Sequence, residues 1–335
     1  MMIWDTEITR RLGIRLPILA GGLQWLGDAP YVAAAAHAGI MGFVTAASFG
    51  GDMDALRAEI RKARDMCGTL PFGVNVSMLP KLVPDDQTAD VFRLIADEGV
   101  TVIETSGRNP EPYIKLLKDF GLTVIHKVPA VRYAVKAQSV GVDMVSIVGA
   151  ECGGHPGMDM IGSFVNGAMA GRDLHIPFLI GGGVGHGSQL VAALAMGASG
   201  VVMGTRLLVA EEVTAHARYK QALVDATERD TVLTMGSVRN TIRTLANETT
   251  VEVARMEAES PDVTIQELLP LVSGQIGRKA YQTGDVSRGM LSAGHALGLT
   301  DKVEPMADII ARIEAEAETA YRKTGQVMHF QEAAE

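Results

Sequence analysis

The sequence predicts a (β/α)8 TIM barrel, and three observations lead to this fold class. Eight short apolar runs alternate with amphipathic stretches and start roughly 20 to 35 residues apart, as repeated β/α units do. The runs are rich in Val and Ile, which is typical of strands buried on both faces of a parallel sheet. The richest glycine turns follow the last three runs, whereas a doubly wound open sheet, the competing fold, would usually carry its glycine fingerprint after the first strand.

The predicted strands are the apolar runs at residues 16–22, 39–47, 72–79, 101–107, 123–129, 144–150, 177–183 and 200–206. The stretches with helical periodicity lie at residues 31–38, 54–66, 88–97, 110–120, 131–140 and 188–196. Gly or Pro often stands at the boundaries between them, as expected where one element ends and the next begins.

The pattern changes after the eighth predicted strand. Residues 211–255 are predicted to form long helices, 265–271 a further helix, and 301–324 a charged closing helix. We therefore expect residues 1–219 and 291–335 to form the barrel, and residues 220–290 to form a helical capping sub-domain over its mouth.

Composition narrows the function classes. The net charge is −9, so nothing draws the chain to nucleic acid or to an anionic membrane surface. Two cysteines, Cys67 and Cys152, are too few for a disulfide framework and fit a reducing compartment. Neither a signal peptide nor an apolar run of about 18 residues is visible, so we expect a cytoplasmic protein with no membrane span.

Glycine loops follow the seventh and eighth predicted strands, at residues 181–188 and 203–206. In TIM barrels the active site lies at the carboxyl ends of the strands, and these two loops commonly bind phosphate. Glycine allows main-chain N–H groups to approach an anion closely, and the helix expected to start near Ser188 would add its positive end. The alternative is that these glycines only form tight turns.

Polar residues at or just past the strand ends are expected to meet in one pocket; they are Gln24, Asn75, Glu104, Lys127, Ser146, Glu151 and His155. Lys127 would place a cation near the barrel axis, where burial requires an anionic partner. That partner could be the electronegative edge of a flavin ring, or Glu104 or Glu151 in a salt bridge. Asn75 can donate and accept hydrogen bonds, which suits the edge of a heterocycle, although it could equally be a turn residue.

The loop after the sixth predicted strand carries the most reactive side chains. His155 lies between Gly154 and Pro156 and could act as a general base or acid, or bind a carbonyl or nitro oxygen. A Cys152–His155 nucleophilic pair is conceivable, but a small buried cysteine is the simpler interpretation. No HExxH or CxxC spacing supports a metal site. His126 is expected to point outward, and the loop residues His186 and His295 have a smaller chance of lining the site.

Several segments of the chain resemble the nitronate monooxygenase family, formerly called 2-nitropropane dioxygenases. They are residues 16–22, 73–75, 149–157, 181–183 and 203–206. The family comprises FMN-dependent barrel enzymes related to a flavin-dependent enoyl-acyl-carrier-protein reductase. The chain is most similar to a subgroup of NAD(P)H:quinone reductases, at residues 21–25, 125–127, 151–157, 239–241, 273–275 and 292–294.

The resemblance implies an FMN site formed by Gly21, Gly22, Asn75, Lys127, Ala150, Glu151, Gly153, Gly182, Gly183, Gly204 and Thr205, with the phosphate in the last two loops. It also implies that His155 lies over the flavin as proton acceptor or substrate clamp, and that Ser292 reaches in from the capping segment. Leu23 replaces a methionine that is usual in the family, and His186 replaces a common acidic residue, which leaves the role of His186 open.

The resemblance therefore implies an FMN-dependent oxidoreductase. Either NAD(P)H or an alkyl nitronate would reduce the flavin, and a quinone or O2 would reoxidise it. An FMN-dependent enoyl-thioester reductase and a non-catalytic flavin-binding protein remain as alternatives. The sequence leaves open the physiological donor and acceptor, the choice between NADH and NADPH, the role of Cys152, and the oligomeric state, for which a homodimer is one option.

Overall fold

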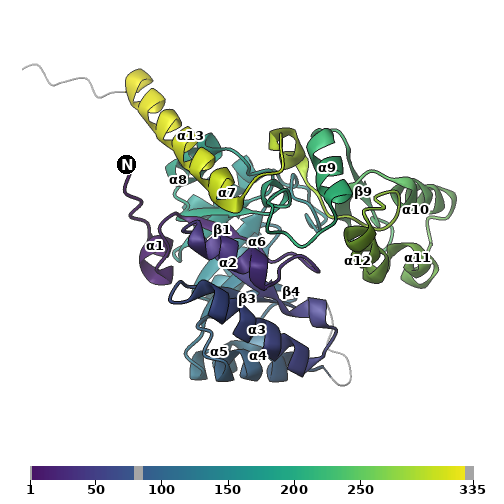
Figure 1. The fold of residues 1–335 in the computed structure, drawn as a ribbon, viewed down its shortest axis with the longest axis horizontal. Coiled ribbons are helices and arrows are strands. Elements are labelled where there is room, and N and C mark those ends of the chain that lie inside the picture. The colour runs from purple at the N-terminus through teal and green to yellow at the C-terminus, as the bar shows by residue number, and fades with distance from the viewer. Residues whose placement is uncertain (1, 79–85, 329–335) are drawn as a thin grey trace, which may run out of the picture.

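The computed structural model of the chain describes residues 2–78 and 86–328. Eight parallel strands close into a barrel in the order of the sequence, and β1 pairs with β8 to complete it (Figure 1). The strands are β1 (Ile18–Ala20), β2 (Met41–Thr45), β3 (Gly73–Met78), β4 (Val102–Gly107), β5 (Thr123–Val128), β6 (Met144–Val148), β7 (Phe178–Gly181) and β8 (Gly200–Met203). Each predicted apolar run contains one strand, so the predicted fold class is confirmed; Leu79, at the end of the third run, lies outside the described residues.

Helices cover the outside of the barrel. They are α2 (Ala29–His37), α3 (Met53–Cys67), α4 (Thr88–Asp97), α5 (Ile114–Asp119), α6 (Val131–Ser139), α7 (Ser163–Asp173) and α8 (Gly187–Ala195). Short 3-10 turns are η1 (Ala46–Phe49), η2 (Glu111–Tyr113) and η3 (Thr205–Leu207). The six predicted helices are present, but α7 was not predicted, because its glycines weaken the periodic apolar pattern.

The barrel interior is packed with apolar side chains rather than open. Leu19, Phe43, Ile125 and Leu179 belong to one buried cluster, which also includes Ile8 of the short helix α1 (Glu7–Leu12). Helix α1 was not predicted from the sequence. Helix α1 packs against this apolar interior through Ile8. Polar groups can therefore gather only at the carboxyl ends of the strands.

His126 lies on the outer face of β5, as predicted. Its ring is buried and its Nδ1 lies 2.9 Å from Thr105 Oγ1. Burial lowers the pKa of His126 to about 4 from an ordinary value of 6.5, so the folded protein holds this imidazole neutral.

We expect the protein to become less stable as the pH is lowered, because of His126. The unfolded chain takes up a proton near pH 6.5 and the folded chain does so only near pH 4, so stability is complete above the higher value and is lost as pH falls between the two. Between pH 7 and pH 5 the free energy of unfolding should drop by about 2 kcal/mol from this group. Denaturant unfolding at both pH values measures the drop, and the His126→Gln variant should show a smaller one; equal drops in the two proteins would refute the assignment.

The segment after the barrel differs from its prediction. Residues 211–255 contain an antiparallel pair, β9 (Thr231–Thr234) and β10 (Ile242–Leu245), where long helices were expected. Both strands are rich in β-branched residues, which favour strands. Met235 and Arg239 have positive φ angles of 62° and 54° between the strands, a backbone conformation that no helix accommodates. The prediction of long helices was therefore wrong for residues 231–245, while the chain is helical on either side, at Ala217–Asp225 and Glu248–Glu259.

We call residues 220–290 the cap. Its other elements are the end of α9 (Ala217–Asp225), α10 (Glu248–Glu259), α11 (Ile265–Val272) and α12 (Gly274–Thr283). The chain then returns through η4 (His295–Leu299) to α13 (Met306–Val327), which packs along the barrel against α8 (Figure 1). Among the described residues, no helix combines the length and the apolar character needed to cross a membrane.

Candidate functional site

The barrel mouth carries a layer of side chains directly above the apolar interior. Side chains alternate between the two faces of a strand, so the residue two positions after each interior residue also points inward. On five neighbouring strands these positions are polar, and we call them the polar arc: Thr45, Asn75, Glu104, Lys127 and Ser146. On the other three strands they are glycines, and we call them the glycine arc: Gly181, Gly204 and Gly21. A flat molecule could lie over the glycine arc with one edge against the polar arc.

Glu104 organises the polar arc. Its side chain is fully buried, and its Oε2 accepts hydrogen bonds from Asn75 Nδ2 at 2.6 Å and from Lys127 Nζ at 2.9 Å. The N–H of Gly22 also donates to Oε2, at 3.3 Å. The salt bridge foreseen as one of the two alternatives for Lys127 is therefore present, with Glu104 and not Glu151 as its partner. Glu104 lies at a strand end as predicted, but its role in holding Asn75 and Lys127 was not predicted.

Three buried oxygen atoms in the polar arc have no hydrogen-bond partner among the described residues. They are Thr45 Oγ1, Glu104 Oε1 and Ser146 Oγ, and all three residues are buried. Buried polar atoms are nearly always paired, because an unpaired one costs about 1–3 kcal/mol. The polar arc is therefore suited to a ligand that offers hydrogen-bond donors and acceptors along one edge.

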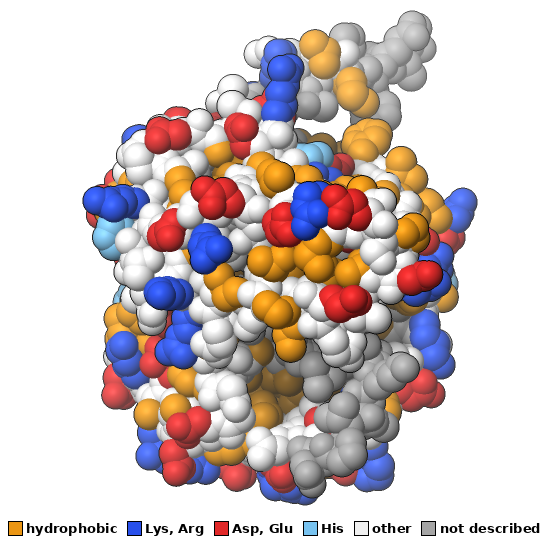
Figure 2. Space-filling view, turned by 90° about the vertical axis from the view of Figure 1, so that its right-hand side faces the viewer, with side chains coloured by type: hydrophobic (Ala, Val, Ile, Leu, Met, Phe, Trp, Pro, Cys, Tyr) orange, Lys and Arg blue, Asp and Glu red, His pale blue; other side chains and the backbone are white. Residues whose placement is uncertain are grey.

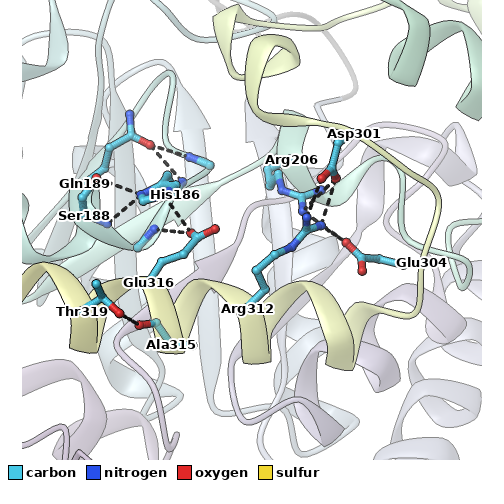
Figure 3. Close-up of polar contacts among 12 residues, drawn as sticks. His186, Ser188, Gln189, Arg206, Asp301, Glu304, Arg312, Ala315, Glu316 and Thr319 are labelled. Atoms are coloured by element: carbon cyan, nitrogen blue, oxygen red, sulfur yellow. Dashed lines mark hydrogen bonds and ion pairs between the residues drawn. The ribbon is translucent and has the colours of Figure 1, made fainter.

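The start of α8 does not offer the anion site that the sequence predicted. Gln189 Oε1 accepts from the N–H groups of Gly185 and His186, at 2.8 and 3.0 Å. His186 Nδ1 accepts from the N–H of Ser188, and Glu316 Oε2 accepts from that of Gly187 at 2.9 Å (Figure 3). Side chains already occupy these donors, and the Glu316 carboxylate lies where an anion would bind. His186 thus caps the helix, a role the sequence left open.

Other main-chain donors remain free at the two glycine loops. No acceptor among the described residues pairs with the N–H of Gly182, Gly183 or Gly204. Gly182 and Gly183 have φ angles of 95° and 71°, which only glycine adopts readily, so their residue type follows from the turn itself. Gly204 is different, because the nearest atom to a Cβ placed there would be Leu23 Cδ2 at 3.8 Å. The space beside Gly204 is left open by the protein.

The contacts of Glu151 and Cys152, in the loop after β6, indicate a structural role for both residues. Both carboxylate oxygens of Glu151 accept from the N–H of Ser163 at 3.0 Å and so cap α7. Cys152 is buried, and this burial raises the pKa of its thiol to about 12. A neutral thiol is a poor nucleophile, so the geometry does not support a Cys152–His155 pair.

His155 is held at the mouth by the main chain of the cap. The N–H of Gly154 donates to Arg243 O at 2.9 Å, and the N–H of Arg243 donates back to Gly154 O at 2.7 Å. The guanidinium of Arg243 also donates to Ala150 O. The imidazole of His155 is accessible to solvent, yet the surrounding protein desolvates it enough to lower its pKa below the ordinary value. It is therefore neutral at neutral pH.

The returning segment brings Ser292 to the same place. A Cβ on Gly154 would lie 3.9 Å from Ser292 Oγ, so the predicted pair of His155 and Ser292 comes from adjacent backbone. A Cβ on Gly153 would lie 2.7 Å from the carbonyl carbon of Ala293, which shows how closely the two segments pack. The N–H of Gly294 donates to Thr205 Oγ1 at 2.9 Å and ties the segment to the loop after β8.

Two hollows lie near these elements. Figure 2 shows the face that carries the cap, and the surface is hollowed beneath it, with apolar side chains inside. A separate cavity of about 360 Å³ lies behind the glycine loop after β7 and is lined by His295, Glu151 and Gly183. His295 therefore faces this cavity.

The fold is a TIM barrel with polar side chains gathered at the carboxyl ends of its strands, where TIM-barrel enzymes have their active sites. The model of the family described as nitronate monooxygenase matches residues 5–316. The chain belongs to the nitronate monooxygenase family and is an oxidoreductase. Members of this family are in general flavoenzymes.

Individual relatives agree with this assignment. A probable nitronate monooxygenase of Staphylococcus saprophyticus is 28% identical over 90% of this chain and 95% of its own length. A (3aS,4S,5R,7aS)-5-hydroxy-7a-methyl-1-oxo-octahydro-1H-indene-4-carboxyl-CoA dehydrogenase of Mycobacterium tuberculosis is 34% identical, over 66% of this chain and 62% of its own length. The structure of FabK from Thermotoga maritima superposes with a TM-score of 0.88 at 32% identity and covers 97% of this chain and 99% of its own.

Proposed function

We propose that the chain is an FMN-dependent oxidoreductase with its flavin held at the barrel mouth. The observation that carries the proposal is the set of unpaired polar groups there: Glu104 Oε1 and Ser146 Oγ in the polar arc, and the free N–H groups at the two glycine loops. A bound flavin accepts two electrons from a donor and passes them to an acceptor.

The residues that would hold FMN divide into three groups. Asn75 and Lys127 would meet the polar edge of the ring system. Gly182, Gly183, Gly204 and Thr205 would hold the phosphate. The ring would pack against main chain at Gly21, Gly22, Ala150 and Gly153, while Glu151 would support the site by fixing the start of α7.

We assign the proton chemistry and substrate contact to His155, with Ser292 beside it. A neutral imidazole can accept a proton or donate a hydrogen bond, and the lowered pKa of His155 keeps it neutral at the pH of the cell. The cap would exclude water from this side of the mouth. Residues 220–290 would thus act as a capping sub-domain.

For turnover we propose NAD(P)H as the electron donor and a quinone as the acceptor. The Arg278 guanidinium of the cap lies 4.9 Å from the centre of the Trp25 ring, in the loop after β1. This contact places a cation at the edge of the mouth, where it suits a phosphorylated donor. The competing route uses an alkyl nitronate as donor and O2 as acceptor, and the similarity to a probable nitronate monooxygenase supports it.

Anaerobic titration of the purified protein separates the two routes. We expect NADH or NADPH to bleach the flavin and a quinone to restore its colour, while propyl 2-nitronate has little effect. Bleaching by the nitronate alone would reject NAD(P)H as the donor. Bleaching by neither would favour a flavin-binding protein without turnover.

An enoyl-thioester reductase is the second candidate. Its support is the Mycobacterium tuberculosis relative, whose name describes a carboxyl-CoA dehydrogenase and so a CoA thioester substrate. Under this alternative an enoyl thioester, and not a quinone, would accelerate NAD(P)H oxidation. The same assay with each acceptor decides between them.

Substituting Gly204 tests where the cofactor binds. The Gly204→Ala variant should keep the stability of the apoprotein within about 1 kcal/mol, because no protein atom lies within 3.4 Å of the added Cβ, yet it should bind FMN at least about tenfold more weakly by filling the space beside the free N–H. Fluorescence titration with FMN measures the affinity. Gly236→Ala in the cap, where the nearest atom is 3.9 Å away, is the matched control and should bind FMN normally. Normal FMN binding by Gly204→Ala would remove Gly204 from the site.

A further inference from the structure

Helix α13 lies behind both glycine loops (Figure 3). It places an acidic side chain, Glu316, at the loop after β7 and a basic side chain, Arg312, near the loop after β8. At the loop after β7, Glu316 Oε2 accepts from the N–H of Gly187 at 2.9 Å and lies 3.6 Å from His186 Nε2. This end of α8 therefore already holds a carboxylate. A phosphate brought there would meet a negative charge.

At the loop after β8 the charge has the opposite sign. Arg206 follows Thr205 directly, and only 2% of its side chain is exposed. Its Nη2 lies 3.3 Å from Glu304 Oε1. The same oxygen forms an ion pair with Arg312 of α13. These three residues, which we call the α13 clasp, are the most buried members of the cluster and combine two cations with one carboxylate. The more exposed Lys302 and Asp301 carry opposite charges and balance each other.

Two guanidinium nitrogens of the α13 clasp also lack hydrogen-bond partners among the described residues. They are Arg206 Nη1 and Arg312 Nε, and both atoms are buried. A surplus positive charge inside the protein acts over a longer distance than one in water, because little solvent screens it. The N–H of Gly204, two residues before Arg206, has no acceptor among the described residues.

We propose that the α13 clasp directs a dianionic phosphate to the Gly204–Thr205 turn and so makes the site select a phosphorylated flavin over an unphosphorylated one. The inference rests on the proposed flavin function and adds positioning residues to it. Arg206 and Arg312 act through the field at the turn, without touching the ligand, while Glu316 keeps the phosphate away from α8.

Affinities for FMN and riboflavin test the proposal, because the two ligands differ only in the phosphate. The full-length protein is freed of flavin and titrated with each ligand by fluorescence. We expect Arg312→Gln to weaken FMN binding about three- to tenfold and to leave riboflavin binding unchanged, since it removes one charge of the α13 clasp. Arg312→Lys retains the charge and should bind both ligands like the wild type.

A second variant changes the charge in the opposite direction. Asp301 is 60% exposed, so Asp301→Asn should fold normally, and by removing a carboxylate it should strengthen FMN binding about twofold without affecting riboflavin. Equal changes for both flavins, or no change in either variant, would overturn the proposal and leave the α13 clasp with a purely structural role. A wild-type protein that binds neither flavin would instead reject the proposed function itself.

Discussion

Replacing His155 by alanine is expected to lower kcat/KM with a quinone about 10²- to 10⁴-fold, the usual contribution of a positioned acid or base. Folding and flavin content should be retained, because His155 makes no hydrogen bond among the described residues and its loop is held through the main chain of Gly154 and Arg243. Steady-state kinetics measures the loss, and the visible absorption spectrum verifies the flavin.

The lowered pKa of His155 predicts how turnover should change with pH. Desolvation lowers the pKa of the imidazole below 6.5, so the wild type should stay active as pH falls to that value and lose activity only below it, when the base becomes protonated. The His155→Ala variant should lack this acid limb. Cys152→Ala, in the same loop, is the matched control and should retain wild-type turnover, because its buried thiol is protonated. Unchanged turnover in His155→Ala would show that the role assigned to His155 is wrong.

Replacing Lys127 by methionine should have the largest effect on stability. Glu104 is fully buried and Lys127 is its charged partner at 2.9 Å, so the variant leaves a carboxylate without a cation in the barrel mouth. Breaking a buried pair in this way costs about 3–5 kcal/mol. The variant should also lose FMN, because the cation at the polar edge of the ring is gone. Denaturant unfolding and flavin content measure the two effects.

A double variant separates the two roles of Lys127. Glu104→Gln with Lys127→Met removes both charges and should regain most of the lost stability, since no unpaired carboxylate remains. It should still bind FMN poorly. Flavin binding restored in the double variant would mean that Lys127 serves only to neutralise Glu104, and a single variant as stable as the wild type would mean that the pair contributes nothing.

The barrel could be predicted because the signal for it is local. Each of the eight apolar runs can be recognised from its own residues, and so can the helical stretches between them. A parallel strand buried on both faces is apolar throughout, so its neighbours in the sheet need not be known. The β9–β10 hairpin was missed for the converse reason. All four residues of β10 are buried, so the strand shows no alternation of buried and exposed sites. Arg243 lies against the loop after β6, and its isolated bridge with Gly154 is a tertiary contact.

The site could be predicted in part. Strand ends identified the positions of Asn75, Lys127 and Ser146, because the alternation of side chains continues to the end of a strand. The partner of Lys127 stayed open between Glu104 and Glu151, because the register between neighbouring strands cannot be read from either strand alone; β4 pairs with β5 and brings Glu104 within 2.9 Å of Lys127. The occupied start of α8 was also invisible in the sequence, because Glu316, which accepts from Gly187, lies 129 residues further along the chain.

The flavin content of the purified protein tests whether FMN binds at the barrel mouth. We expect a yellow protein that releases an equimolar amount of FMN on denaturation, loses its flavin in Lys127→Met and binds FMN more weakly in Gly204→Ala. A colourless protein that takes up no FMN when the cofactor is supplied would contradict this expectation, and so would equal binding by both variants and the wild type.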